Sequence, residues 1–126
     1  MINTDDAIWV QEILIEKYGG SKGIRNIKLL ESAVSRPFQT MDKKDLYFTP
    51  IEKAAALIES ILNNHPFIDG NKRAGYVLMR LLLMEYGFDI AATIDEKYNF
   101  VIAIAKGDIN YDKIKEWLKY KVKMTL

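Results

Sequence analysis

The sequence of 126 residues contains no cysteine and a single histidine. Without cysteine the chain has no disulfide framework, no thiolate nucleophile and no cysteine-ligated zinc, and one histidine excludes a histidine-rich metal site. An excess of charge of one sign is also missing: 18 lysines and arginines face 17 acidic residues, which leaves a formal net charge of +1. Because no strong overall field results, we expect no direct nucleic-acid partner and no membrane partner.

Long apolar runs and an N-terminal export signal are likewise absent. Stretches such as Phe100 to Ala105 are far shorter than the ~20 residues that a membrane span needs. The start from Met1 to Asp6 has neither the basic nor the apolar region of a signal peptide. No linker, repeat or low-complexity tract divides the chain. We therefore predict one cytoplasmic domain over residues 1–126.

Helix start and stop signals, in contrast, recur along the whole chain. Capping residues followed by apolar residues at helical spacing predict six helices. Their expected ranges are Asn3 or Thr4 to Tyr18, Ile27 to Ser35, a third helix from Thr49-Pro50-Ile51-Glu52, Lys72 to Tyr86, a fifth helix from Thr93-Ile94-Asp95-Glu96, and Asn110 to Val122. The fourth range is apolar on most of its circumference, which predicts a central, buried helix. With no convincing pair of strands, the pattern predicts a compact all-α bundle of about six helices.

One polar stretch with aromatic residues at both ends, Pro37 to Phe48, falls outside the helices. Connections of this length often serve as lids or binding elements. An ordinary connection is the favoured alternative here, and it predicts that Phe38 and Phe48 are tucked into the core.

The residues that carry chemistry concentrate in His65-Pro66-Phe67-Ile68-Asp69-Gly70-Asn71-Lys72-Arg73, immediately before the central helix. The first N–H groups of a helix have no partner within it, and the helix dipole adds partial positive charge there. The turn therefore predicts an anion site, with phosphate as the natural ligand. Gly70 permits a nest of backbone N–H donors, and Lys72 and Arg73 add charge-assisted contacts.

Two further side chains of this segment suit phosphoryl or nucleotidyl transfer. Asp69 supplies a hard oxygen for Mg²⁺, which usually binds through one or two carboxylates plus substrate phosphates. His65 supplies the only imidazole of the sequence, and an imidazole is the side-chain group that most often serves as a general base. Each residue alone also has a structural interpretation, since Asp-Gly-Asn is a common turn and two adjacent cations are typical of a solvated surface. Their combination favours the chemical interpretation.

This order of residues closely resembles the motif of the Fic/Doc (fido) family, His-x-Phe-x-Asp/Glu-Gly-Asn-x-Arg. The similarity, to the short Doc branch of the family, also includes Gly19-Gly20 through Leu30-Glu31-Ser32-Ala33, the aromatic-rich loop and the helix that runs into Asn64, so it covers most of the chain. The resemblance implies an all-α fido fold with an ATP site in the motif loop.

The same resemblance implies a role for each motif residue. His65 would deprotonate a target hydroxyl, and Asp69 would hold Mg²⁺. The phosphates of ATP would be bound by Gly70, Asn71, Lys72 and Arg73. The catalytic residues implied are His65, Asp69 and Arg73.

Two positions depart from the pattern of the adenylyl-transferring Fic proteins. Lys72 stands where they typically have glycine, and Tyr76 where they have a further arginine. A lysine side chain fills the space in which glycine lets the backbone approach a second phosphate. The run Asn71-Lys72-Arg73 is similar to the Doc branch, which binds ATP in the opposite sense and transfers its γ-phosphoryl group to a threonine of elongation factor Tu. The resemblance therefore implies a toxin that is a protein kinase and halts translation elongation.

No internal inhibitor of the kind that many Fic proteins carry is present, because no glutamate is followed by glycine or asparagine. The Doc branch uses a small Phd-like antitoxin, so we expect such a partner. Two alternatives stay open: a Fic-like protein adenylyltransferase, and a non-catalytic helical binding module that has kept the motif loop.

Overall fold

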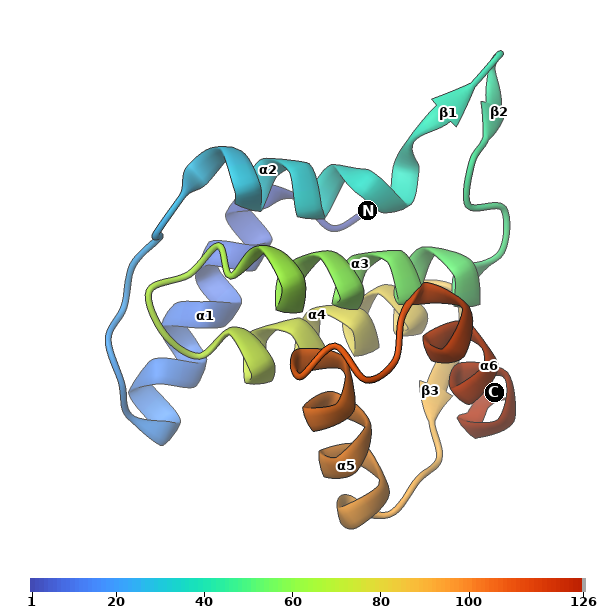
Figure 1. Cartoon of the computed structure of the whole chain (residues 1–126). Coiled ribbons are helices and arrows are strands. Elements are labelled where there is room, and N and C mark those ends of the chain that lie inside the picture. Colours follow the sequence, from blue (N-terminus) through green and yellow to red (C-terminus); the bar gives the residue numbers. More distant parts are fainter. Residues whose placement is uncertain (126) are drawn as a thin grey trace.

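The computed structural model describes residues 1–125 as a bundle of helices (Figure 1). Within this range the helices are α1 (Thr4–Tyr18), α2 (Ile27–Ser35), α3 (Pro50–Asn64), α4 (Asn71–Glu85), α5 (Ile94–Ala105) and α6 (Tyr111–Lys121), with one 3₁₀ turn, η1 (Arg36–Phe38). The predicted compact all-α bundle of about six helices is therefore confirmed. No helix in the described part of the chain is both long and apolar enough to cross a membrane.

The helices begin at the capping residues that the sequence indicated. Asn3, rather than Thr4, caps α1: its side chain accepts a hydrogen bond from the Asp6 N–H at 2.9 Å, and the Asp6 carboxylate accepts one from the Asn3 N–H at 3.0 Å. Thr49 and Glu52 form the same reciprocal pair at the start of α3. Because such a pair satisfies two N–H groups locally, a cap worth ~1 kcal/mol can be recognised from four consecutive residues.

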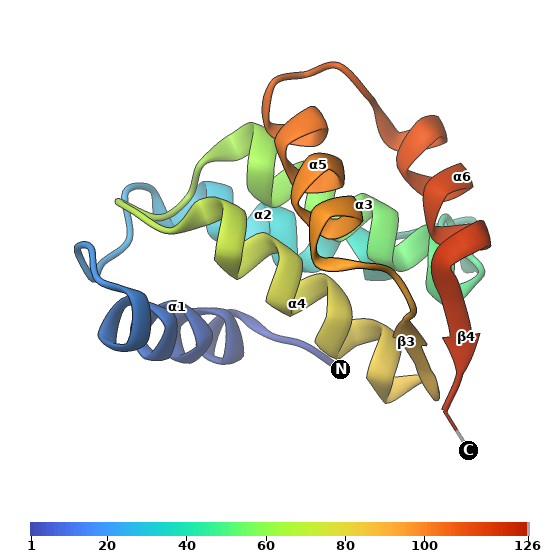
Figure 2. The ribbon, with the colours of Figure 1, turned by 90° about the horizontal axis from the view of Figure 1, so that it is seen from below.

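α3 and α4 lie side by side at the centre, and the other helices surround them. α2 and α6 pack against α3, and Figure 2 shows α4 between α1 and α5. The core-facing side of α4 carries Leu78, Met79, Leu82 and Leu83, all fully buried. The outer edge of α4 differs from the prediction, because Leu81 and Met84 line an open groove between α1 and α4 and are 37% and 46% exposed.

Two small antiparallel pairs of strands were not predicted. β1 (Thr40–Met41) pairs with β2 (Lys44–Asp45), and β3 (Phe88–Ile90) pairs with β4 (Val122–Met124). The strands have two or three residues each, too few to show an alternating pattern, and two helices separate β3 from β4. Val122 accordingly belongs to β4 and not, as expected, to the sixth helix.

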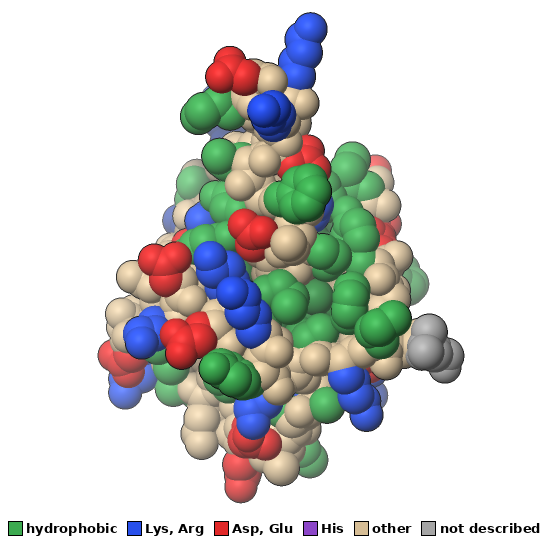
Figure 3. Space-filling view, turned by 90° about the vertical axis from the view of Figure 1, so that its right-hand side faces the viewer, with side chains coloured by type: hydrophobic (Ala, Val, Ile, Leu, Met, Phe, Trp, Pro, Cys, Tyr) green, Lys and Arg blue, Asp and Glu red, His purple; other side chains and the backbone are tan. Residues whose placement is uncertain are grey.

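Residues 37–48 form a hairpin at the N-terminal end of α3, and Figure 3 shows it standing away from the body at the top of the view. Phe38 packs partly buried against the core, as predicted. Phe48 is 79% exposed, so the prediction that it is tucked into the core is wrong. Tyr47 takes the inward position instead, and its hydroxyl accepts a hydrogen bond from Arg36 Nε at 2.9 Å.

Candidate active site

The motif segment lies in the loop between α3 and α4, at the end of α3 that is away from the hairpin (Figure 1). His65 ends α3 with φ 48° and ψ 58°, a left-handed conformation that is uncommon for residues other than glycine. Its N–H still donates to the Ile61 carbonyl at 3.2 Å. The left-handed turn therefore stops the helix and leaves the imidazole exposed.

A second segment, residues 23–26, runs antiparallel to the motif loop and holds it in place. Ile24 forms an isolated bridge with Phe67, and the Pro66 carbonyl accepts a hydrogen bond from the Arg25 N–H at 2.7 Å. Phe67 is 1% exposed. The buried Phe67 side chain thus fixes the motif loop to the core, and main-chain hydrogen bonds with residues 23–26 fix the edge of the loop.

The Arg25 side chain satisfies carbonyl groups at the C-terminus of α3. Its Nε donates to the His65 carbonyl and its Nη2 to the Asn64 carbonyl, both at 2.6 Å. The last carbonyls of a helix have no partner within the helix, and they form the negative end of its dipole. The Arg25 guanidinium therefore gives these carbonyls hydrogen-bond partners and also places a positive charge at the negative end of the helix dipole.

Asn71 closes the motif loop from its other side. Its Oδ1 accepts a hydrogen bond from the Phe67 N–H, and its Nδ2 donates to the Phe67 carbonyl, both at 3.0 Å. Both polar atoms of the amide are therefore engaged with the main chain. A contact between Asn71 and a phosphate would use its backbone N–H, which belongs to the first turn of α4.

The Asp69 carboxylate is oriented by two backbone groups. Its Oδ1 accepts a hydrogen bond from the Gly70 N–H at 2.9 Å, and its Oδ2 accepts one from the Ser21 N–H at 3.2 Å. Gly20 makes this approach possible, because a Cβ at that position would lie 2.6 Å from Asp69 Oδ2. The side chain is exposed, and each oxygen keeps acceptor capacity, so a cation can still bind.

Gln11 is a buried polar residue that ties α1 to the same place. It is 2% exposed, and its Nε2 donates to the carbonyls of Ser21 and Asp69, each at 3.1 Å. Both ends of the Asp69 residue, the carboxylate and the main-chain carbonyl, are therefore fixed by groups that come from α1 and the loop after it.

The N-terminus of α4 is free to receive an anion. Gly70 is the N-cap residue with φ 72°, no side chain caps the helix, and its first turn contains no acidic residue. Lys72 and Arg73 are exposed, and neither forms an ion pair with a carboxylate of residues 1–125. Arg73 lies over the ring of Tyr18, with its Cζ 4.5 Å from the ring centroid. Free N–H groups beside two unpaired cations form a donor set suited to phosphate.

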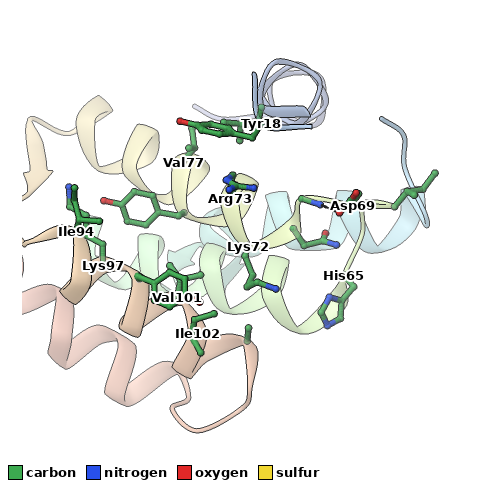
Figure 4. A pocket seen from close by; sticks show the side chains of 17 residues that line it. Tyr18, His65, Asp69, Lys72, Arg73, Val77, Ile94, Lys97, Val101 and Ile102 are labelled. Carbon is green, nitrogen blue, oxygen red and sulfur yellow. Dashed lines mark hydrogen bonds between the residues drawn. The ribbon is translucent and has the colours of Figure 1, made fainter. Parts of the chain in front are cut away.

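These groups line one cleft of about 690 Å³ between the motif loop, α1, α4 and α5 (Figure 4). The polar end of the cleft is lined by His65, Asp69, Gly70, Asn71, Lys72 and Arg73, and the opposite wall by the α5 residues Ile94, Lys97, Tyr98, Val101, Ile102 and Ala105. All six site residues predicted from the sequence are therefore brought together. The wall that α5 contributes was not predicted.

Tyr76 also lines the cleft, one turn after Arg73 on α4. Its hydroxyl oxygen is buried and has no hydrogen-bond partner among residues 1–125. Burial raises the pKa of this phenol, so the group is neutral at physiological pH. The position at which adenylyl-transferring Fic proteins carry a further arginine thus supplies no positive charge here.

Three residues near the site were missed by the sequence analysis: Gln11, Tyr18 and Arg25. Gln11 had a usable signal, because it shares the buried side of α1 with Ala7 and Ile15 at four-residue spacing, where an apolar residue is expected. Tyr18 and Arg25 had none. Their contacts join segments that are distant in sequence, and no local pattern marks them.

The fold and the site define a helical protein whose loop before a central helix brings an uncapped helix N-terminus and two exposed cations together with a histidine and a carboxylate. Comparison with known proteins gives the family. The model of the Fic/DOC family matches residues 1–83. Toxin Doc of Mycolicibacterium smegmatis is 34% identical over 99 residues, which are 77% of this chain and 76% of that protein. A fido domain-containing protein of Dictyostelium discoideum is 35% identical over 66 residues, 52% of this chain and 46% of that protein. The chain therefore belongs to the Fic/Doc family.

Proposed function

We propose that this protein is a Doc-like toxin that transfers the γ-phosphoryl group of ATP to a hydroxyl side chain of a translation factor, with elongation factor Tu as the expected target. One observation carries the proposal. The unpaired cations Lys72 and Arg73 and the free N-terminus of α4 share a cleft with His65 and Asp69. A phosphate site beside an imidazole that can act as a general base has the parts that phosphoryl transfer to a hydroxyl requires.

The volume and the lining of the cleft support a nucleotide as its ligand. Its volume of about 690 Å³ is within the range of small-molecule sites, ~300–1,000 Å³. The phosphates would lie at the N-terminus of α4, against Lys72 and Arg73. The apolar side chains Val101 and Ile102 on the α5 wall, opposite these cations in Figure 4, offer a surface for the nucleoside.

Asp69 is suited to hold Mg²⁺ together with the phosphates of ATP. Its carboxylate is exposed and already oriented by two backbone N–H groups. A single carboxylate is sufficient, because Mg²⁺ usually completes its shell with substrate phosphates and water. Bound Mg²⁺ would supply positive charge next to the phosphates.

The proposed reaction assigns His65 the role of general base. Its imidazole takes the proton of the target hydroxyl while the hydroxyl oxygen forms a bond to the γ-phosphorus. The bond from that phosphorus to the oxygen bridging the β- and γ-phosphates breaks, and ADP leaves. Lys72, Arg73 and the first N–H groups of α4 are in place before the reaction, so they can stabilise the phosphate charge without reorganising.

Lys72 and Tyr76 support the transfer of a phosphoryl rather than an adenylyl group. The Lys72 side chain lines the cleft at the position where a glycine would leave room for a second phosphate. Tyr76 is neutral where an arginine would attract that phosphate. Because Lys72 fills the second phosphate subsite and Tyr76 supplies no positive charge to it, we expect the γ-phosphate to lie beside His65.

The assignment as a toxin is supported by the similarity to Toxin Doc of M. smegmatis. A toxin of this kind needs restraint in the cell that makes it. Since no glutamate of the sequence is followed by glycine or asparagine, we expect the restraint to come from a separate Phd-like antitoxin.

Mass spectrometry of elongation factor Tu, incubated with the purified protein and Mg-ATP, tests the proposal. A kinase adds about 80 Da to the target and an adenylyltransferase about 329 Da. A bacterial lysate incubated in the same way covers other targets. A product heavier by about 329 Da overturns the kinase assignment, and no modification of any protein in the lysate by a folded, ATP-binding protein overturns the enzymatic assignment.

A further inference from the structure

We propose that Arg25 is a positioning residue for His65: its guanidinium holds the histidine backbone in the left-handed conformation that presents the imidazole to the cleft. The inference rests on the proposed role of His65 as general base. It adds Arg25 as the residue that orients this base. Arg25 lies outside the motif, 40 residues before His65 in the chain.

The starting observation is the backbone of His65 itself. Its φ of 48° is one of three positive values among the residues other than glycine in the described chain, and the other two, at Asp42 and Lys43, form the turn of the β1–β2 hairpin. A helix that ends in this conformation usually has glycine at that position, since a Cβ there lies too close to the following carbonyl oxygen. A histidine remains in such a conformation only where surrounding contacts oppose its relaxation.

Arg25 makes those contacts with three successive carbonyl groups. Its Nη2 donates to the Asn64 carbonyl and its Nε to the His65 carbonyl, both at 2.6 Å, and its own N–H donates to the Pro66 carbonyl at 2.7 Å. The Asn64 carbonyl belongs to the peptide plane before His65, and the His65 carbonyl to the plane after it. Rotation about φ and ψ of His65 moves these two planes. A planar guanidinium that binds both carbonyls therefore restrains both angles.

The charge of Arg25 has no competing use in the structure. The side chain is exposed, and it forms no ion pair with a carboxylate within residues 1–125. Its two side-chain hydrogen bonds both end on the carbonyls next to the imidazole. A lysine could offer a single point of contact in place of this fork, so arginine is the residue type that the geometry requires.

Steady-state kinetics of three variants test the inference. Arg25→Met removes the fork, Arg25→Lys keeps a cation that can bind one carbonyl, and Arg80→Met is the matched control. Arg80 also binds through a fork, to Asp89 at 2.9 and 3.0 Å, but it joins α4 to β3. A base displaced by ~1 Å can cost up to about 100-fold in rate, so we expect at least a tenfold loss of kcat in Arg25→Met. The KM for ATP should stay within about twofold, because the phosphate-binding groups do not depend on Arg25.

The controls distinguish positioning from ordinary destabilisation. Arg25→Lys should have a kcat between those of the wild-type protein and Arg25→Met, and Arg80→Met should keep the wild-type kcat. An unchanged kcat in Arg25→Met overturns the inference. An equal loss of kcat in Arg80→Met at the same loss of Tm overturns it as well. If Arg25→Met does not fold, the Arg25→Lys variant decides by the same criterion.

A second measurement needs neither ATP nor a target. Because the sequence contains one histidine, the imidazole signals in an NMR spectrum belong to His65 without further assignment. We expect one set of signals in the wild-type protein and in Arg80→Met, and a second set or exchange broadening in Arg25→Met. One sharp set in all three overturns the inference. A wild-type protein that transfers no phosphoryl group refutes the proposed function only, since the NMR comparison still decides whether Arg25 positions His65.

Discussion

The hairpin end of the molecule and the cleft end hold their cations in opposite states. At the hairpin end, Arg36 binds Glu59 in the second half of α3 at 2.9 Å, and Lys53 in the first turns of α3 is only 5% exposed, with its ammonium group on the Tyr47 carbonyl. At the cleft end, Lys72 and Arg73 in the first turn of α4 are exposed and have no carboxylate partner within the described chain. A buried cation must be paired when the protein folds, whereas an exposed cation in a cleft can stay unpaired until a ligand binds.

The contrast shows which polar groups belong to the fold and which remain for a ligand. Under the hairpin, Arg36 also lies over the rings of Tyr47 and Tyr111, so its charge is enclosed by other side chains. At the cleft, Asn71 in the motif loop and the buried Gln11 behind the loop form hydrogen bonds with the main chain. They thereby hold the loop while leaving its cations and the helix N-terminus free. Substitutions at the two ends should therefore separate stability from activity.

The largest effect is expected for His65→Ala at the cleft end. Removing a general base costs about 10²–10⁴ in rate, so transfer of label from γ-³²P-ATP to the target should fall by that factor. Expression of the wild-type protein without a partner should arrest growth, and the variant should relieve the arrest. Normal growth of cells that contain abundant, folded wild-type protein would contradict the assignment as a toxin.

Arg36→Met tests the hairpin end. The variant leaves Glu59, 14% exposed, without its partner, so we expect a loss of about 2–3 kcal/mol in the free energy of unfolding. Urea denaturation measures the loss, and Arg80→Met, which removes a more exposed ion pair, should cost about 0–1 kcal/mol. The activity of folded Arg36→Met should stay close to that of the wild-type protein. A loss of kcat in Arg36→Met without a loss of stability would contradict the separation of stability from activity between the hairpin end and the cleft end.

Asp69→Ala tests the proposed metal ligand. We expect the Mg²⁺ concentration that gives half-maximal transfer to rise at least about tenfold, because the variant removes the protein's hard oxygen next to the phosphates. Titration of Mg²⁺ at saturating ATP provides the measurement. The same half-maximal concentration in both proteins would remove Asp69 from the metal site.

Lys72→Gly tests the orientation of ATP. Loss of a charged hydrogen bond worth ~1.5–3 kcal/mol should reduce γ-transfer about tenfold or more. The opened space should admit a second phosphate and allow some transfer of α-³²P label, limited by the neutral Tyr76. The wild-type protein should transfer only γ-label. Transfer of α-label by the wild-type protein, or full γ-transfer by Lys72→Gly, would contradict the proposed orientation.

The smallest effect separates the backbone of His65 from its chemistry. His65→Gly and His65→Ala should be equally inactive, but glycine adopts the left-handed conformation without the steric cost of a Cβ. We therefore expect His65→Gly to be about 1 kcal/mol more stable than His65→Ala. Urea denaturation of the two variants is the measurement. Equal stability of the two variants would show that the left-handed backbone conformation at residue 65 costs no free energy when a Cβ is present.

The sequence predicted the elements whose cause is local. Asn3 with Asp6, and Thr49 with Glu52, mark helix starts that the structure confirms, because each cap is complete within four residues. The strand pair β3–β4 was not predicted, since β3 precedes α5 in the sequence and β4 follows α6. The exposure of Phe48 escaped for a related reason: which of two neighbouring aromatic side chains turns inward depends on the position of Arg36.

For the site, the sequence by itself determined the inventory: a histidine, a carboxylate, a Gly-Asn turn and two cations directly before a helix, a run of nine residues that chain connectivity keeps together. The tertiary structure decided how those groups are held and what they face. Arg25 binds the carbonyls beside His65, Gln11 and Ser21 fix Asp69, and α5 closes the far wall of the cleft. The physical reason is that these contacts join the motif loop to α1, to the loop after α1 and to α5, which are distant from it in sequence. The identity of such partners depends on which segments meet in space, and no local pattern in the sequence records that.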